Sequence, residues 1–205
     1  MAKLETDRLV LRPFTPANAE AMYRNWESDP EVMRFMGIEA CKSMDEIHDR
    51  ISNWMNYFNE LGDSAWSVFV IELKSDGEVI GAIDFAETNR EARSAEIGYR
   101  IGKAWWGKGY ITEALKAVIS YCFGVVGLNR LWANYDPRNP ASGKVMLKAG
   151  MLYEGTARQC KIRGGELVDR IYYAILKEDW DIQNEVAHYN SLPCEHNGFV
   201  NVPTM

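Results

Sequence analysis

The fold is decided by one continuous stretch that predicts a strand, a glycine-rich turn and a helix. The stretch begins Ala95-Glu96-Ile97-Gly98-Tyr99-Arg100-Ile101, continues Gly102-Lys103-Ala104-Trp105-Trp106-Gly107-Lys108-Gly109-Tyr110, and runs on through residues 111–126. Its first part alternates and is rich in aromatic and β-branched residues, as strands are. Its last part has apolar residues at helical spacing, namely Ile111, Ala114, Leu115, Val118, Ile119, Cys122 and Phe123.

Three glycines and two lysines lie between the predicted strand and the predicted helix. Such a turn directs several free backbone N–H groups to one point, which the positive end of the helix dipole also faces. This arrangement favours an anion, and phosphate is the usual one. An ordinary tight strand-to-helix turn has the same composition, so both interpretations stand at this point.

Composition limits the class of protein. The chain has 205 residues and a net charge of −6, which fits one soluble domain with no global attraction to nucleic acid or an anionic membrane. An acidic surface weakly favours a cationic or amine substrate. We expect reduced thiols, no metal site and a cytoplasmic location, because neither the cysteines nor the histidines show paired or metal-ligand spacing and the N-terminus lacks a signal peptide's apolar core.

The rest of the chain predicts alternating blocks of strand and helix. Strands are predicted over residues 4–12, 65–73, 79–87, 95–101, 130–135, 152–162 and 167–176. Helices are predicted over residues 15–27, 30–36, 43–61, 111–126 and 140–149. The third helix carries an apolar stripe that indicates core packing, composed of Met44, Ile47, Ile51, Trp54, Met55, Phe58 and Leu61.

These elements predict an α+β fold with a mixed, mostly antiparallel sheet flanked by helices. The three strands between residues 65 and 101 are joined by short turns, so we expect an antiparallel meander. A right-handed crossover should place strand 130–135 parallel beside the Glu96 strand. We expect a single domain over residues 1–180 and an irregular C-terminal tail over residues 181–205, where periodicity disappears.

A magnesium–nucleotide loop is the first alternative for the glycine turn. Gly102, four further residues and then Gly107-Lys108 match a P-loop in every required residue except the last one. The hydroxyl residue that would hold magnesium is replaced by Gly109. Residues 130–135 before Asp136 could imitate the metal-binding strand of such an enzyme. However, Asn134 interrupts this strand and Pro137 follows it, so a nucleoside triphosphatase is poorly supported.

Motifs spread over residues 4–180 resemble the GNAT superfamily of acyl-CoA-dependent N-acyltransferases. Within it, the chain looks most like the ribosomal-protein N-terminal (RimJ/RimL-like) acetyltransferase branch, which also includes polyamine and antibiotic acetyltransferases. The similar segments, in family order, are 4–12 (LETDRLVLR), 95–99 (AEIGY), 106–114 (WGKGYITEA), 139–142 (NPAS), 148–151 (KAGM) and the closing segment 155–180.

The resemblance implies acetyl-CoA as the acyl donor and residues Trp106, Gly107, Lys108, Gly109, Tyr110 and Ile111 as its pyrophosphate loop. Lys108 would add charge there, or be an ordinary solvated lysine. The pantetheine arm would contact backbone groups near Arg100 and Ile101, with Asn139 as a side-chain contact or a plain helix cap. Trp106 and Ile111 depart from the family's usual Gln or Arg and Gly or Ala, which puts side-chain contacts to phosphate in doubt.

The resemblance also implies catalytic groups. Glu96 is the candidate base for the attacking amine; a solvated carboxylate or a pair with Arg100 is the alternative. Ser142 is the candidate that assists the leaving thiolate, although it could be a plain first-turn residue. Tyr135 and bulk water are weaker candidates. Many family members carry a tyrosine where this chain has Met146, which cannot donate a proton.

The acceptor is the least defined part of the sequence. Tyr23, Trp26, Phe35 and Met36 come from the region that usually walls the acceptor site, or they belong to the core. Asp169 and Glu166 on the last hairpin could attract a cationic amine or be solvated. We expect a protein N-terminal amine or a small amine such as a polyamine or aminoglycoside; a silent acyl-CoA-binding module is the alternative from another class. No nucleic-acid or membrane partner is expected, and the protein is expected to be a monomer or homodimer.

Overall fold

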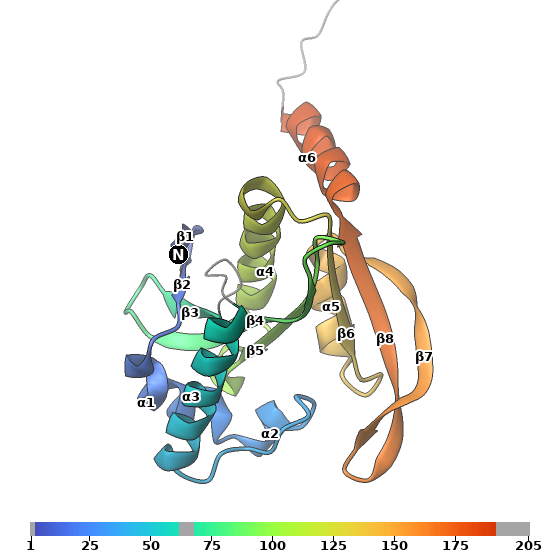
Figure 1. The fold of residues 1–205 in the computed structure, drawn as a ribbon. Helices are drawn as coiled ribbons and strands as arrows, with labels where there is room; N and C mark the ends of the chain where they lie inside the picture. Colours follow the sequence, from blue (N-terminus) through green and yellow to red (C-terminus); the bar gives the residue numbers. More distant parts are fainter. Residues whose placement is uncertain (1–2, 62–67, 192–205) are drawn as a thin grey trace, which may run out of the picture.

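One mixed sheet runs through the part of the chain that the computed structural model describes, residues 3–61 and 68–191 (Figure 1). Its strands are β1 (Leu4–Glu5), β2 (Leu9–Pro13), β3 (Phe69–Leu73), β4 (Val79–Asn89), β5 (Ser94–Ile101), β6 (Arg130–Tyr135), β7 (Leu152–Arg163) and β8 (Glu166–Leu176). Their order across the sheet is β1-β2-β3-β4-β5-β6-β8-β7. The predicted fold class, a mostly antiparallel mixed sheet flanked by helices, is confirmed.

Helical segments cover this sheet. The α-helices are α1 (Ala19–Met22), α2 (Pro30–Met33), α3 (Met44–Leu61), α4 (Tyr110–Tyr121), α5 (Pro140–Lys148) and α6 (Lys177–Ser191). Shorter or wider turns are the 3-10 segments η1 (Pro16–Asn18) and η3 (Lys103–Trp105) and the π segments η2 (Tyr23–Glu27) and η4 (Cys122–Val126).

Strand pairing follows the predicted topology from β3 onward, whereas the single strand predicted over residues 4–12 is wrong, because β1 and β2 are separate strands that pair antiparallel. β3, β4 and β5 form the antiparallel meander, and β6 pairs parallel with β5 after the α4 crossover. β7 and β8 form the predicted terminal hairpin at one edge of the sheet, with α6 continuing from the end of β8 (Figure 1). The parallel pair is short, since it joins only residues 94–96 to residues 130–132.

The two faces of the sheet bury separate apolar clusters. On β3, Phe69 and Ile71 point to the α4 side, while Val70 points to the side covered by α1 and α3. The alternation of strand side chains explains why neighbouring residues serve opposite clusters. Helix α4 contributes its predicted apolar face, from Ile111 to Ile119, to the first cluster.

The early helical region is less regular than predicted. Residues 16–27 form η1, α1 and η2 instead of one helix, because Ser28 bonds the Tyr23 carbonyl through its N–H and its hydroxyl and so widens the last turn. Helix α2 ends at Met33, three residues early. On α3, Met55 is 44% exposed and lies outside the buried stripe. The side chains of Phe58 and Leu61 lie outside the described residues.

The irregular tail predicted from Asp181 is wrong for its first part, because α6 runs through Ser191. Individual contacts hold this helix: Trp180 packs on Phe123 with ring centroids 5.9 Å apart, and Gln183 Nε2 donates to the Gly150 carbonyl at 3.0 Å. Because a few individual contacts hold α6, its sequence needs no apolar stripe and shows none. Residues 192–205 lie outside the described part.

Three of the four cysteines are free thiols as predicted, with Cys41 and Cys122 buried and Cys160 exposed. Cys194 lies outside the described residues. A search of the described helices finds none that combines the length and the apolar character needed to span a bilayer.

Candidate active site

The strands β5 and β6 diverge at Glu96, the last β5 residue with a partner on β6. Beyond it, β5 continues to pair with β4 and β6 continues to pair with β8. The facing edges of residues 97–101 and 133–135 therefore have no ladder bonds to each other, and such an edge can bind an extended, amide-bearing chain. A cavity of about 750 Å³ is lined by residues from both edges.

The cavity extends from the start of α4 to the side chains of the opposite sheet face. We call the part lined by Gly107, Gly109, Tyr110 and Ile111 the loop end. We call the part lined by Phe35, Glu96, Asn134, Arg163 and Arg170 the Glu96 end. Glu96 alternates with Ala95 and Ile97, which pack on the α4 side, so its carboxylate lies on the other face.

The loop end is shaped by backbone. Gly107 and Gly109 have φ of 74° and 80°, in the left-handed region that favours glycine. The first main-chain bond into α4 runs from Glu113 N to Gly109 O, so the N–H groups of residues 110–112 make no helical bond. Trp106, Gly107, Gly109, Tyr110 and Ile111 line the cavity, whereas Lys108 does not. These free N–H groups and the helix dipole make the loop end suitable for a phosphate.

Arg8, on the segment before β2, holds this loop in place. Its Nη1 donates to the Lys108 carbonyl at 3.1 Å, and its guanidinium lies 4.4 Å from the Tyr110 ring centroid. Its Nε donates to Glu113 Oε2 at 2.6 Å, and Thr6 Oγ1 donates to Glu113 Oε1 at 2.6 Å. Partial burial alone would raise the pKa of Glu113, but the bonds from Thr6 and Arg8 outweigh it and lower that pKa. Sequence reasoning quoted Arg8 within a motif without giving it this role.

Trp106 is bound back onto the strand. Its Nε1 donates to the Ile101 carbonyl at 2.9 Å, while 43% of the residue remains exposed. The sequence predicts that backbone groups near Ile101 contact the pantetheine arm. Its carbonyl already accepts the indole N–H, which leaves one lone pair for any ligand.

Glu96 belongs to a hydrogen-bonded chain of three side chains. Asn134 on β6 donates its Nδ2 to Glu96 Oε1, and Arg170 on β8 donates its Nε to Asn134 Oδ1 at 2.5 Å. Because a guanidinium only donates, it fixes the amide oxygen of Asn134 toward Arg170 and the amide nitrogen toward Glu96. Neither Asn134 nor Arg170 was predicted, since each looks like an ordinary polar strand residue in the sequence.

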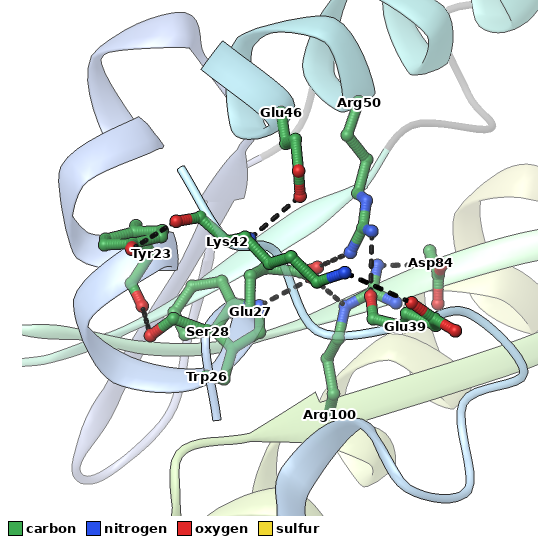
Figure 2. A network of polar contacts seen from close by, with 10 residues as sticks. All are labelled: Tyr23, Trp26, Glu27, Ser28, Glu39, Lys42, Glu46, Arg50, Asp84 and Arg100. Atoms are coloured by element: carbon green, nitrogen blue, oxygen red, sulfur yellow. Dashed lines mark hydrogen bonds and ion pairs between the residues drawn. The ribbon is translucent and has the colours of Figure 1, made fainter. Parts of the chain in front are cut away.

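Arg100, which lines the cavity, lies in a buried ionic network that Figure 2 shows. Its Nε is 3.3 Å from Glu27 Oε1 and its Nη2 is 3.2 Å from Asp84 Oδ2. Glu27 is fully buried and also pairs with Arg50 on α3. The network connects the early helical region to β5 through charges that are removed from water.

Helix α5 brings its candidate residues to the cavity. Asn139 and Ser142 both line it. Tyr99 Oη lies 2.9 Å from the Ser142 carbonyl and 2.9 Å from Ser142 Oγ, which ties β5 to the first turn of α5. Burial raises the pKa of Tyr99, so this phenol stays protonated.

Two groups near α5 bear on the proton donor. Met146 is 2% exposed and packs in the α4-side core, where its thioether has no role in proton transfer. Tyr135 lies on the cavity wall with its ring against Gly143; a Cβ there would come within 2.6 Å of the phenol oxygen. Burial raises the pKa of Tyr135 as well, so it too is a protonated donor.

Several predicted acceptor-site residues do not line the cavity. Trp26 is fully buried and donates its Nε1 to Glu27, and the Tyr23 hydroxyl donates to the Lys42 carbonyl. Asp169 accepts a bond from Gln159 N within the β7–β8 hairpin. Glu166, on the hairpin, is exposed and lies 3.8 Å from the Arg138 guanidinium. Phe35 and Met36 do line the cavity.

Among the described residues, no group of three or more His, Cys, Asp and Glu side chains is arranged to hold a metal ion.

The sheet splays beside a glycine turn, and the cavity there reaches a carboxylate. The chain belongs to the GNAT acetyltransferase family: the model described as acetyltransferase (GNAT) domain matches residues 8–152. It is therefore an acetyltransferase, and acetyl-CoA is the donor that this family uses.

Two curated relatives and one solved structure illustrate the similarity. The uncharacterised N-acetyltransferase YoaA of Bacillus subtilis is 36% identical over 85% of this chain and 96% of its own. The ribosomal protein uS5-alanine N-acetyltransferase of Escherichia coli is 30% identical over 87% and 92%. A GNAT-family acetyltransferase structure from Bacillus anthracis has a TM-score of 0.76 and 28% identity, covering 86% of this chain and 99% of its own.

Proposed function

We propose that the protein acetylates a primary amine by direct attack on acetyl-CoA, with a protein N-terminal amine as its acceptor. The observation that carries this proposal is one cavity that joins the free N–H groups at the start of α4 to the Glu96 carboxylate through the gap between β5 and β6. The uS5-alanine relative supports a protein acceptor. A small amine, including a polyamine, is the alternative acceptor.

The residues present fit a CoA ester. Backbone N–H groups of residues 107–111 would hold the pyrophosphate, with Lys108 adding charge and Arg8 keeping the loop in shape. Trp106 would border the phosphates with its indole and replace the polar side chain usual there. The β5 edge at Arg100 and Ile101 and the amide of Asn139 would bind the amide-bearing arm. When bound, acetyl-CoA supplies a thioester whose carbonyl carbon accepts the amine and whose sulfur leaves.

Glu96 is proposed as the base. An ammonium has no lone pair, so the acceptor must lose a proton before its nitrogen can bond to carbon. The Glu96 carboxylate, oriented by Asn134, would take that proton directly or through a water molecule. Ser142 and Tyr135 are proposed to donate a proton to the leaving sulfur, since both line the cavity and carry a hydroxyl group. The Met146 thioether has no proton to donate.

The test combines binding and turnover. Isothermal titration with acetyl-CoA should show binding, and thiol release with a panel of amines should show transfer. Glu96→Gln should keep acetyl-CoA affinity and lower kcat by about a hundredfold or more. Glu20→Gln, an exposed helix position, is the matched control and should keep both. Unchanged turnover of Glu96→Gln would remove Glu96 from the mechanism, and binding without transfer to any amine would favour the silent module.

A further inference from the structure

The Arg170 guanidinium is only partly satisfied by the residues that the structure describes. Its Nε and Nη2 both donate to Asn134, at 2.5 Å and 3.2 Å. Its Nη1 is buried and has no hydrogen-bond partner among the described residues. Arg170 is only 7% exposed, and it lines the cavity. A buried charged donor without an acceptor is costly, so this nitrogen indicates a ligand that brings an oxygen to it.

A second guanidinium lies at the same place. Arg163, at the tip of the β7–β8 hairpin, also lines the cavity, and its Nε is buried without a partner among the described residues. Its guanidinium lies against Gly37, which has φ of 81° and leaves no room for a Cβ at that contact. Both arginines therefore present a buried nitrogen without a described partner to the same cavity, and burial together with the Arg163 charge lowers the pKa of Arg170.

The acids around these arginines are already engaged. Asp136 lies near Arg170 but is held by Arg138, with Oδ2 2.7 Å from Nη2. Glu96, the other acid near Arg170, accepts from Asn134.

The described cavity lining as a whole is basic although the chain is acidic. Its seven cationic side chains are Arg34, Arg100, Lys144, Lys148, Lys161, Arg163 and Arg170. Its four acidic side chains are Glu31, Asp84, Glu96 and Asp136, and the first two are paired with Lys103 and Arg100. A polyamine would meet repulsion at the Glu96 end, contrary to what the acidic composition suggested.

We propose that the acceptor amine carries a carboxylate, which binds Arg170 Nη1 and the Arg163 guanidinium while the amine faces Glu96. A guanidinium matches a carboxylate in shape and charge. The carboxylate belongs either to a free amino acid or to an acidic side chain close to a protein N-terminus. This inference rests on the proposed function and narrows its acceptor.

Paired acceptors that differ in this carboxylate provide the test, with rates compared at equal concentration of the unprotonated amine, because amidation of alanine also lowers the pKa of its amine. Alanine is compared with alaninamide, and a C-terminally amidated peptide that begins Ala-Glu is compared with one that begins Ala-Gln. The wild type should prefer the acid in one of the two pairs by about tenfold or more in kcat/KM. Arg163→Met and Arg170→Met should move that ratio toward one. Arg158→Met, at an exposed β7 position outside the cavity lining, should keep it.

Three outcomes would overturn the carboxylate site. The wild type could show no preference in either pair, or spermidine could be the better acceptor. Arg170→Met could also slow both members of a pair equally, which would mean that Arg170 only positions Asn134. Titration of the same acceptors into protein saturated with CoA measures the preference even where no thiol is released. A preference without turnover would refute the proposed transfer alone, and turnover without a preference would refute the carboxylate site alone.

Discussion

The two ends of the cavity are built from different materials. The loop end consists of main-chain N–H groups from one short segment, held by Arg8. The Glu96 end consists of side chains from the segment after α2, from β5, β6 and β8, and from the hairpin tip. Arg100, which lines the same cavity, belongs to the buried ionic network with Glu27. A backbone site binds whatever carries phosphate and is largely independent of sequence. A site made of side chains depends on sequence, so in the proposed function the Glu96 end selects the acceptor.

The largest effect is expected where the Glu96 end is supported. Glu27→Ala leaves Arg50 and Arg100 without their shared carboxylate in a buried environment. Removing one partner of a buried ion pair costs about 3–5 kcal/mol of unfolding free energy. Chemical denaturation measures this loss, and Glu20→Ala, at an exposed position of α1, should stay within about 0.5 kcal/mol. A loss below about 1 kcal/mol would show that the network contributes little to that wall.

The next effect should fall on the loop end. Gly109→Ala forces a side chain into a left-handed conformation, which costs about 1–2 kcal/mol and displaces N–H groups of the α4 start. Acetyl-CoA affinity should fall about tenfold to a hundredfold, as measured by titration.

Gly77→Ala is the matched control for this loop variant, because Gly77 has φ of 75° in a hairpin turn away from the cavity. It should lose similar stability and keep the dissociation constant. Equal affinity in both variants would separate the loop from phosphate binding.

A smaller effect should follow from loosening the loop without changing it. Arg8→Met removes the bond to the Lys108 carbonyl and the pair with Glu113, both of which are partly exposed. The dissociation constant for acetyl-CoA should rise about threefold to tenfold. Arg24→Met, which breaks the exposed pair with Glu78, provides the control. If Arg8→Met and Arg24→Met bound acetyl-CoA equally well, Arg8 would not hold the loop in the shape needed for binding.

The smallest effect concerns acid stability near the Glu96 end. Hydrogen bonding from Arg138 lowers the pKa of Asp136 against the opposing effect of burial. The unfolded chain therefore binds a proton more readily, and this contribution to stability is present above the unfolded pKa of about 4 and lost as pH falls through the folded pKa. Asp136→Asn should lose less stability than the wild type between about pH 5 and pH 3 in denaturation titrations. Parallel stability curves would contradict this assignment.

The difference between the ends also explains what the sequence could predict. The strand, turn and helix around residues 95–126 were predictable because they are contiguous and because glycine spacing and apolar periodicity report local backbone directly. Arg170 was not predicted, since its contact with Asn134 depends on how β6 and β8 pair. Arg163 was not predicted either, because its place in the cavity wall depends on where the β7–β8 hairpin lies in the fold. Trp26 was expected at the acceptor site from its position in the chain, but its neighbour Glu27 turns inward and buries with it.

Helix α6 shows a second limit of the same kind. Apolar periodicity identifies a helix that covers a core, whereas α6 is held by a few contacts such as Trp180 on Phe123 and a lysine–aspartate pair one turn apart, Lys177 with Asp181. A helix stabilised in this way leaves little pattern in the sequence.

The bond between Trp106 and the Ile101 carbonyl has an optical consequence. This indole lies at the phosphate turn with much of its surface open, whereas Trp26 is sealed in the core. Indole emission responds to the polarity and hydrogen bonding of its surroundings, so occupancy of the turn should be visible in the intrinsic fluorescence of the protein. Comparison with Trp106→Phe isolates that signal. Donor binding can then be followed without a label and before any acceptor has been identified.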